Sequence, residues 1–215
     1  MIYELNSEDI LKIVVDGKCI GSGVYGMIYE YDDTTLIKLY YKDFFKFFTS
    51  KNVDDLNQEI DINLFVENEM LEMRDDYVTK RERLINIINC LNKANCSLIK
   101  GIVLYRGYPI GIFLNYYKGY FNLGEIFETL DEKSKLFVMN KIKLILFNLF
   151  SCGIYPLDLK ESNILVNVEN LDVQFIDLDG GETRYEDEEY IKRFDYIEKE
   201  AVKAFEIMEQ RLKVK

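Results

Sequence analysis

Residues 155–167 read Tyr-Pro-Leu-Asp-Leu-Lys-Glu-Ser-Asn-Ile-Leu-Val-Asn, and three polar side chains precede an apolar run. Asp158, Lys160 and Asn163 supply a carboxylate, an ammonium group and an amide. The apolar residues 164–166 that follow predict a buried strand. A surface loop has little need for three such groups in so short a span, so the pattern predicts a site where they hold a ligand.

The composition limits the classes of protein to which the chain can belong. Its 215 residues, 48% hydrophobic and 30% charged, suffice for one large domain or two small lobes with a buried core. The formal charge of −11 argues against binding to a nucleic-acid backbone, which requires clustered Lys and Arg. The chain contains no His, which excludes Ser-His-Asp and Cys-His catalysis.

The sequence also predicts the compartment. Its four cysteines are scattered and lack the spacing of zinc ligands, as in proteins of a reducing compartment. The N-terminal stretch does not resemble a signal peptide, and no apolar run approaches the roughly 20 residues of a membrane span. We therefore expect a cytoplasmic protein with no membrane or nucleic-acid partner.

The pattern of apolar residues predicts an α+β protein in two parts. Residues 1–117 are expected to contain a capped helix at 6–11, strands at 18–21, 27–31 and 36–41, helices at 57–72 and 79–92, and a hairpin at 97–117. Residues 118–215 are expected to contain a helix at 131–152, a hairpin at 164–176 and an amphipathic helix after 188. The first part is thus a predicted five-stranded lobe with a helical insertion, and the second a minimal helical lobe.

A glycine-rich stretch, Gly21-Ser22-Gly23-Val24-Tyr25-Gly26, lies between the first two of these strands. A dinucleotide-binding fingerprint leads from a strand into a helix, whereas this stretch leads into another strand. A glycine flap between two strands lets backbone N–H groups approach phosphates. A glycine-rich hairpin without a ligand is the alternative interpretation.

Two further charged residues interrupt apolar runs. Lys38 lies within the strand at 36–41, where it needs an anion if it points inward and faces water if the strand is at an edge. Asp177 follows the second strand of the hairpin at 164–176, where an aspartate can also form a turn. Asp158, Asn163 and Asp177 together offer the oxygen ligands that Mg²⁺ prefers, completed by a substrate phosphate.

The glycine stretch, Lys38, the run Asp-Leu-Lys-Glu-Ser-Asn-Ile-Leu at 158–165 and Asp-Leu-Asp at 177–179 occur in the order of the protein-kinase motifs. Over roughly residues 18–181 the chain therefore resembles the protein-kinase-like superfamily. In size it resembles the compact atypical members, such as RIO-type and small-molecule kinases. The resemblance implies a bilobal fold with a β-rich N-lobe, a truncated and mainly helical C-lobe, and ATP and Mg²⁺ as cofactors.

The resemblance also implies a role for each matching residue. Asp158 would accept the proton of the acceptor hydroxyl, and Lys160 would lie beside the γ-phosphate. Asn163 and Asp177 would hold Mg²⁺, and Lys38 would contact the α- and β-phosphates.

The remaining matching positions would surround the nucleotide. The backbone of Gly21, Gly23 and Gly26 would cover the phosphates. The adenine would contact Ile28, Leu36, Leu165, the gatekeeper Leu114 and the backbone of Asn115 and Tyr117. The glutamate that pairs with Lys38 is assigned to Glu82, and Glu59 is the alternative.

Departures from the kinase pattern shape the expectation. Pro156-Leu157 replaces the usual His-Arg before the catalytic aspartate, which implies no common phosphorylation-dependent activation loop. Asp179 stands where a glycine is usual, and Leu36 is larger than the usual alanine under adenine. After Asp177 there is no Ala-Pro-Glu motif and no room for the helices that hold peptide substrates in ordinary protein kinases.

The expected function is that of a kinase, an ATP- and Mg²⁺-dependent phosphotransferase to a hydroxyl acceptor. The sequence does not say whether the acceptor is a protein or a small molecule. Two alternatives stay open: a nucleotide-binding regulatory module of the pseudokinase type, and a kinase-like enzyme that transfers AMP.

Overall fold

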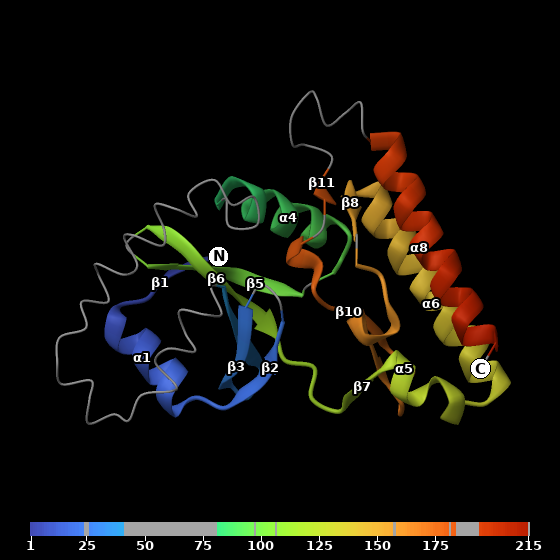
Figure 1. Ribbon diagram of the computed structural model, residues 1–215, viewed down its shortest axis with the longest axis horizontal. Helices are drawn as coiled ribbons and strands as arrows, with labels where there is room; N and C mark the ends of the chain where they lie inside the picture. Colours follow the sequence, from blue (N-terminus) through green and yellow to red (C-terminus); the bar gives the residue numbers. More distant parts are fainter. Residues whose placement is uncertain are drawn as a thin grey trace. The chain divides into compact units, whose positions relative to one another are not determined.

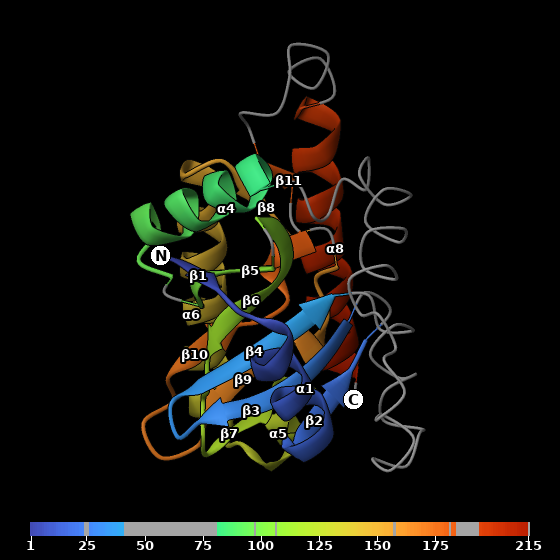
Figure 2. The same cartoon turned by 90° about the vertical axis from the view of Figure 1, so that its left-hand side faces the viewer.

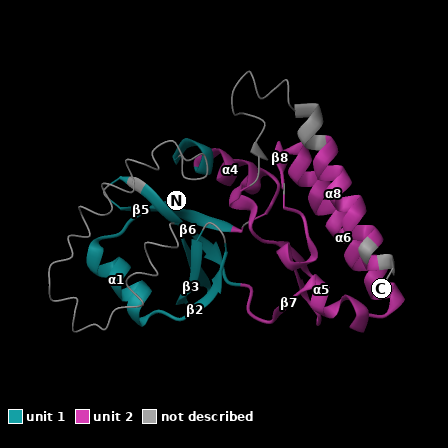
Figure 3. Ribbon diagram, in the orientation of Figure 1, with its two compact units in different colours: residues 1–84, 99–116 teal, residues 85–98, 117–215 magenta. Residues whose placement is uncertain are grey.

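The computed structural model of the chain describes residues 1–23, 26–40, 81–96, 98–105, 107–156, 158–180, 182–183 and 194–214. The chain divides into two compact units (Figure 3). Unit 1 comprises residues 1–84 and 99–116, and unit 2 comprises residues 85–98 and 117–215. The described elements form an α+β protein, as the apolar pattern predicts. The lobe boundary expected after residue 117 stays a prediction.

Unit 1 is built on a six-stranded mixed sheet with the strand order β1-β5-β6-β4-β3-β2. Its strands are β1 (Ile2–Glu4), β2 (Cys19–Ser22), β3 (Gly26–Asp32), β4 (Thr35–Tyr40), β5 (Ile99–Tyr105) and β6 (Tyr108–Asn115). β1 runs parallel to β5, and the other neighbours are antiparallel. Five of these strands coincide with predicted ones. β1 is a sixth strand that local pattern does not predict.

Helix α1 (Ser7–Asp16) covers one face of this sheet (Figure 2). It begins with the predicted cap: the Asn6 side chain accepts a hydrogen bond from the backbone N–H of Asp9, and the Asp9 carboxylate accepts one from the N–H of Asn6. Ile10 and Val14 then pack against sheet side chains that share this face, which include Met27, Tyr29, Ile37, Leu39 and Phe113.

Helix α4 (Arg81–Lys93) corresponds to the second of the two predicted helices in the insertion. The first four residues of α4 belong to unit 1, and the rest of the helix belongs to unit 2. The other predicted helix, at 57–72, and the alternative glutamate, Glu59, lie outside the described residues.

Unit 2 contains two small sheets. β9 (Ile164–Asn167) lies between β10 (Val173–Phe175) and β7 (Tyr120–Asn122), and all neighbours are antiparallel. β8 (Ile154–Tyr155) pairs with β11 (Glu182–Thr183). The β9–β10 hairpin matches the hairpin expected at 164–176, whereas β7, β8 and β11 are too short to be read from local sequence.

Helical segments surround these sheets. They are α5 (Leu123–Ile126), the 3-10 helix η3 (Phe127–Thr129), α6 (Glu132–Ser151), the 3-10 helices η4 (Glu161–Asn163) and η5 (Leu178–Gly180), and α8 (Phe194–Val214). α6 and α8 run side by side (Figure 1), and Lys143 of α6 forms an ion pair with Glu209 of α8 at 2.8 Å. The Phe150 and Tyr155 rings stack beneath Ala201. None of the described helices has the length and apolar character needed to cross a membrane.

Candidate functional site

The stretch that follows β8 brings the first three predicted site residues into contact. Lys160 Nζ donates a hydrogen bond to Oδ2 of Asp158 at 2.5 Å, and Nδ2 of Asn163 donates to the same oxygen at 3.2 Å. A second bond from Nδ2 of Asn163 reaches the backbone carbonyl oxygen of Asp158 at 2.8 Å. The 3-10 helix η4 provides this closure because it returns Asn163 to the residue five positions earlier.

The burial of these groups differs in a way that suits separate tasks. The Asn163 residue is 8% exposed, so its amide is fixed inside unit 2. The Asp158 side chain is 60% exposed, and the second oxygen of its carboxylate, Oδ1, accepts no hydrogen bond from a described residue. An ordered carboxylate with one oxygen held and the other open can accept a proton from an incoming hydroxyl.

The hydrogen bonds that its nitrogen donates also orient the Asn163 amide. Both of its side-chain hydrogen bonds within the described residues are donated by Nδ2. An amide that directs its nitrogen at Asp158 directs its oxygen elsewhere, and within the described part of the chain no group donates to Oδ1 of Asn163. This oxygen has the chemistry of a Mg²⁺ ligand.

The β9–β10 hairpin places Asp177 near Asn163. Phe175 lies opposite Ile164 in the antiparallel register, and the N–H of Ile176 donates to the carbonyl oxygen of Asn163 at 2.9 Å. Asp177 is the next residue along the chain. The hairpin register therefore places Asn163 and Asp177, the two metal ligands predicted from the sequence, at the same end of the hairpin.

Asp177 has a backbone conformation that few side-chain-bearing residues adopt. Its φ is +61°, in the left-handed region, where Asp is more common than most non-glycine residues. Such conformations cost free energy and are concentrated at functional sites. The neighbouring Asp179 is almost fully buried in η5.

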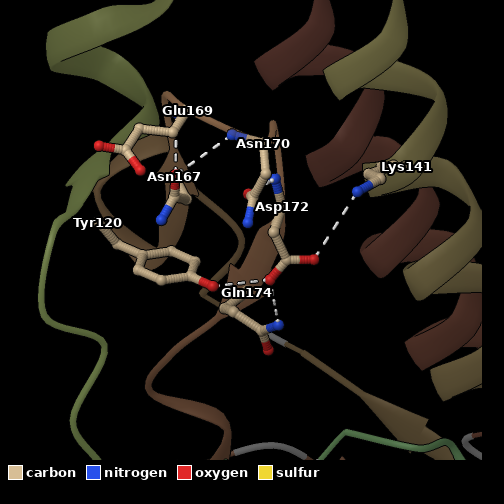
Figure 4. Close-up of polar contacts among 7 residues, drawn as sticks. All are labelled: Tyr120, Lys141, Asn167, Glu169, Asn170, Asp172 and Gln174. Atoms are coloured by element: carbon tan, nitrogen blue, oxygen red, sulfur yellow. Dashed lines mark hydrogen bonds and ion pairs between the residues drawn. The ribbon is translucent and has the colours of Figure 1, made fainter.

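A second polar cluster fixes the opposite end of this hairpin (Figure 4). Tyr120 on β7 and Gln174 on β10 each donate a hydrogen bond to Oδ2 of Asp172, at 2.9 and 2.8 Å. Lys141 on α6 lies 3.7 Å from the other Asp172 oxygen. The local sequence does not predict this cluster, although the Asn167-x-x-Asn170-x-Asp172 spacing is typical of a polar turn.

Two pKa values report on this cluster. Burial raises the pKa of Asp172, but the hydrogen bonds from Gln174 and Tyr120 and the charge of Lys141 outweigh burial, so the pKa lies below its ordinary value. Burial and the hydrogen bond to anionic Asp172 raise the pKa of the Tyr120 hydroxyl. The cluster therefore holds an ionised Asp172 and ties β7 and α6 to the hairpin that carries Asn163 and Asp177.

In unit 1, Lys38 lies on the sheet face opposite to α1. Side chains alternate along a strand, and its neighbours Ile37 and Leu39 belong to the core beneath α1. Lys38 is opposite Ile28 on β3 and Ile112 on β6, and is only 7% exposed. The lysine is therefore an inner residue of a central strand and not an edge residue, which resolves the alternative left open by the sequence.

The same sheet face gathers the residues expected around adenine. Leu36 lies opposite Leu114 across the β4–β6 pair, and Ile28 lies opposite Lys38 across the β3–β4 pair. All four residues have the strand parity that directs them away from the core under α1. Unit 1 thus presents four aliphatic side chains, those of Ile28, Leu36, Ile112 and Leu114, on the same sheet face as one lysine.

The glycine-rich stretch closes the β2–β3 hairpin, and the N–H of Gly23 donates to the carbonyl oxygen of Gly26 at 2.9 Å. A Cβ atom at Gly26 would lie 2.4 Å from the Leu39 carbonyl oxygen, so packing requires glycine there. A Cβ atom would meet nothing within 4 Å at Gly23 and would make only ordinary contact at Gly21. Packing thus explains Gly26, whereas the two open glycines suit the close approach of a ligand to the backbone.

The remaining predicted residues are less closely grouped. Asn115 ends β6 opposite Thr35, and Tyr117 packs its ring against Tyr120 with 5.3 Å between centroids. Leu165 is half-buried on β9 and, by alternation, faces away from the fully buried Ile164 and Val166.

Glu82 is exposed in the first turn of α4, and no ion pair or hydrogen bond joins it to Lys38 in the described structure. Its assignment as the partner of Lys38 stays a prediction, as does that of Glu59.

Comparison with known proteins adds no family assignment: no protein-family model matches the chain, and no curated protein matches it. Among the described residues, no three His, Cys, Asp or Glu side chains lie together in a group that could hold a metal ion.

Proposed function

We propose that the chain is an ATP- and Mg²⁺-dependent phosphotransferase with a bilobal protein-kinase-like fold. The observation that carries the proposal is the hydrogen-bonded group of Asp158, Lys160 and Asn163, with Asp177 next to the residue that bonds to Asn163. The six-residue run that contains the first three thus folds into one polar group that faces solvent on one side. A simple turn would not require a lysine and an amide on the same carboxylate oxygen.

The contents of unit 1 support the nucleotide. Lys38 lies among Ile28, Leu36 and Leu114 on one sheet face, which offers a cation for phosphate beside an apolar surface for a purine ring. Gly21 on β2, the strand that borders β3, and Gly23, which follows that strand, leave space for a ligand to approach the backbone. In this proposal unit 1 is the N-lobe and supplies nucleotide-binding residues, and unit 2 is the C-lobe and supplies the residues of the transfer.

The residues of unit 2 would carry the transfer itself. Oδ1 of Asp158 accepts the proton of the acceptor hydroxyl while the acceptor oxygen forms a bond to the γ-phosphorus. The bond from that phosphorus to the β–γ bridging oxygen breaks, and ADP leaves. Lys160 offsets the negative charge of the transferred group, and Asn163 keeps the Asp158 carboxylate in position.

The donor set fits the expected metal. Oδ1 of Asn163 and the carboxylate of Asp177 are hard oxygen ligands, as Mg²⁺ requires, and Mg²⁺ commonly takes its other ligands from phosphate and water. When bound, Mg²⁺ would neutralise part of the triphosphate charge.

Mass measurement of the intact protein after incubation with Mg·ATP, combined with separation of the nucleotides, tests the proposal. We expect ADP to accumulate with wild-type protein and an added mass of phosphate if the chain or a bound acceptor is modified. Asp158→Ala should abolish ADP formation and retain ATP binding. Glu169→Gln, which removes an exposed acid from the same hairpin, is the matched control and should behave as wild type.

The other outcomes discriminate between the alternatives. If AMP is added to the protein and pyrophosphate is released, the reaction is AMP transfer and not phosphoryl transfer. ATP binding without turnover would indicate a pseudokinase role. ADP formation by Asp158→Ala at the wild-type rate would contradict the role assigned to Asp158.

A further inference from the structure

Helix α6 is apolar on both of its sides. Its buried side carries Val138, Met139, Ile142, Leu146 and Leu149. The opposite side carries four exposed residues, Leu136, Phe137, Leu144 and Phe147. Phe147 is the most exposed of these four, at 68%. The four lie one, seven and three residues apart, which at about 100° per residue places all four within about 100° of the helix circumference, so they form one stripe about 16 Å long. We call them the α6 stripe.

A groove adjoins one end of the α6 stripe. It has a volume of about 590 Å³ and lies in unit 2 between η3, α6 and α8. Its apolar lining comes from Phe127, Leu136, Met139 and Leu212, so Leu136 belongs to both the stripe and the groove. A groove of this volume admits an aromatic side chain with space for its neighbours.

The charged residues on the rim of the groove, three acids and two lysines, are joined in ion pairs. Lys135 lies 3.0 Å from Glu132 and 3.8 Å from Glu128, and Lys143 lies 2.8 Å from Glu209. An apolar side chain that enters the groove therefore meets paired charges and does not isolate one. The rim gives no reason to expect a strongly charged ligand, although the chain as a whole is acidic.

We propose that the α6 stripe and the adjoining groove form a self-complementary surface through which two copies of the chain associate. The two copies would pair their α6 helices in antiparallel orientation about a two-fold axis that passes the stripe side of α6 at the level of residue 142 along the helix. Phe137 and Phe147 are five residues before and after Ile142, and Asn140 and Leu144 are two residues before and after it. Each copy therefore sets its Phe147 beside Phe137 and the groove of the other, as an isologous interface requires.

Charge at the helix ends is compatible with this orientation. Lys133 is exposed near the N-terminus of α6, and the last turn of α6 contains no basic residue. In an antiparallel pair Lys133 of one copy reaches the C-terminal turn of the other, where the helix dipole favours a cation.

The size of the surface predicts a modest affinity. Side chains of this size expose roughly 100 Å² each when about half to two thirds of their surface is free. Eight of them in a pair, with the groove and the lysine stems, approach the ~1,200 Å² at the lower end of specific interfaces. We therefore expect association at micromolar or higher protein concentrations.

Sedimentation analysis of the full chain from about 1 to 300 μM tests the surface, a range set by the affinity expected for a small interface. We expect a reversible shift from monomer to dimer, lost in Phe147→Asp and in Leu144→Glu with unchanged circular dichroism. Phe121→Ser, which removes an exposed aromatic side chain from β7, should dimerise as wild type does. A wild-type chain that stays monomeric throughout, or a dimer that survives both stripe substitutions, would overturn the proposal.

Crosslinking tests the antiparallel register. In a background with Cys19→Ser and Cys152→Ser, one chain carries Asn140→Cys and another carries Leu144→Cys. Paired helix axes lie about 8–10 Å apart, which suits a short bismaleimide better than a disulfide. We expect the mixture to give crosslinked heterodimer at least several-fold faster than either chain alone gives homodimer. Equal rates would rule out this register.

Discussion

The Nδ2 atom of Asn163 donates to the backbone carbonyl oxygen of Asp158 at 2.8 Å and to the carboxylate oxygen Oδ2 of the same residue at 3.2 Å. One buried amide thus fixes both the backbone and the side chain of the proposed proton acceptor. The same residue accepts the backbone hydrogen bond that aligns Ile176, the residue before Asp177. Asn163 is therefore the residue that connects the two acids of the proposed site.

Replacing Asn163 tests this connection. Asn163→Ala removes both bonds from a nearly buried group, and we expect a loss of about 1–3 kcal/mol in the free energy of unfolding. ADP formation should fall by roughly 100-fold or more, because a displaced catalytic group costs about that much. Urea unfolding and the turnover assay measure the two effects. A stable variant with wild-type turnover would show that Asn163 does not position Asp158.

The left-handed conformation of Asp177 predicts that stability and function separate at this residue. Glycine adopts φ = +61° without steric cost and alanine does not. We expect Asp177→Gly to be more stable to urea than Asp177→Ala by about 1 kcal/mol. Both should lose the Mg²⁺-dependent part of ATP binding. Normal Mg²⁺-dependent ATP binding by the glycine variant would show that the Asp177 carboxylate is not a metal ligand.

The glycine-rich hairpin offers a matched pair of substitutions. Gly26→Ala places Cβ against the Leu39 carbonyl oxygen, and we expect a loss of about 1–3 kcal/mol in stability. Gly23→Ala meets open space, so its stability should be unchanged within about 0.5 kcal/mol. Gly23→Ala should nevertheless weaken ATP binding. Calorimetric melting measures the stability of the two variants, and titration with ATP measures their affinity. An unchanged affinity in Gly23→Ala would contradict the ligand role of Gly23.

The polar cluster around Asp172 predicts a pH dependence. Its pKa is lowered in the folded state, so its stabilising contribution is complete above the unfolded pKa of about 3.9 and is lost as the pH falls through the folded value. Asp172→Asn should lower stability at pH 7 by about 1 kcal/mol, since a third of the side chain is exposed. The difference between the two proteins should shrink in urea unfolding as the pH falls from 5 to 3. If the difference in the free energy of unfolding stayed constant over this pH range, the ionised carboxylate of Asp172 would not be the source of the stability.

Local sequence signals predicted the elements whose structure depends on local chemistry. The Asn6 cap, the long apolar helix α6 and the β9–β10 hairpin all occur where the pattern placed them, within one or two residues. The contact of Asp158, Lys160 and Asn163 follows from the same cause, because a single 3-10 turn closes the short run between them.

Other features depend on contacts that are distant in sequence. β1 forms because it pairs with β5: the N–H of Ile102 donates to the carbonyl oxygen of Met1, and the N–H of Leu5 donates to that of Leu104. The three residues of β1 are too few to carry a recognisable strand pattern of their own. The Tyr120–Asp172 bond likewise joins residues 52 positions apart. The alternation of one strand could not show whether Lys38 was at an edge. Its partners Ile28 and Ile112 determine that.

The central claim is that the chain binds ATP through Mg²⁺ held near Asn163 and Asp177. The melting temperature of wild-type protein and of Asp177→Asn, measured with ATP in the presence and absence of Mg²⁺, tests it most directly, because a ligand that binds only the native state raises the melting temperature. We predict a rise for wild type that requires both ATP and Mg²⁺ and that is absent in the variant. No change in wild type, or an equal rise in both proteins, would contradict the claim.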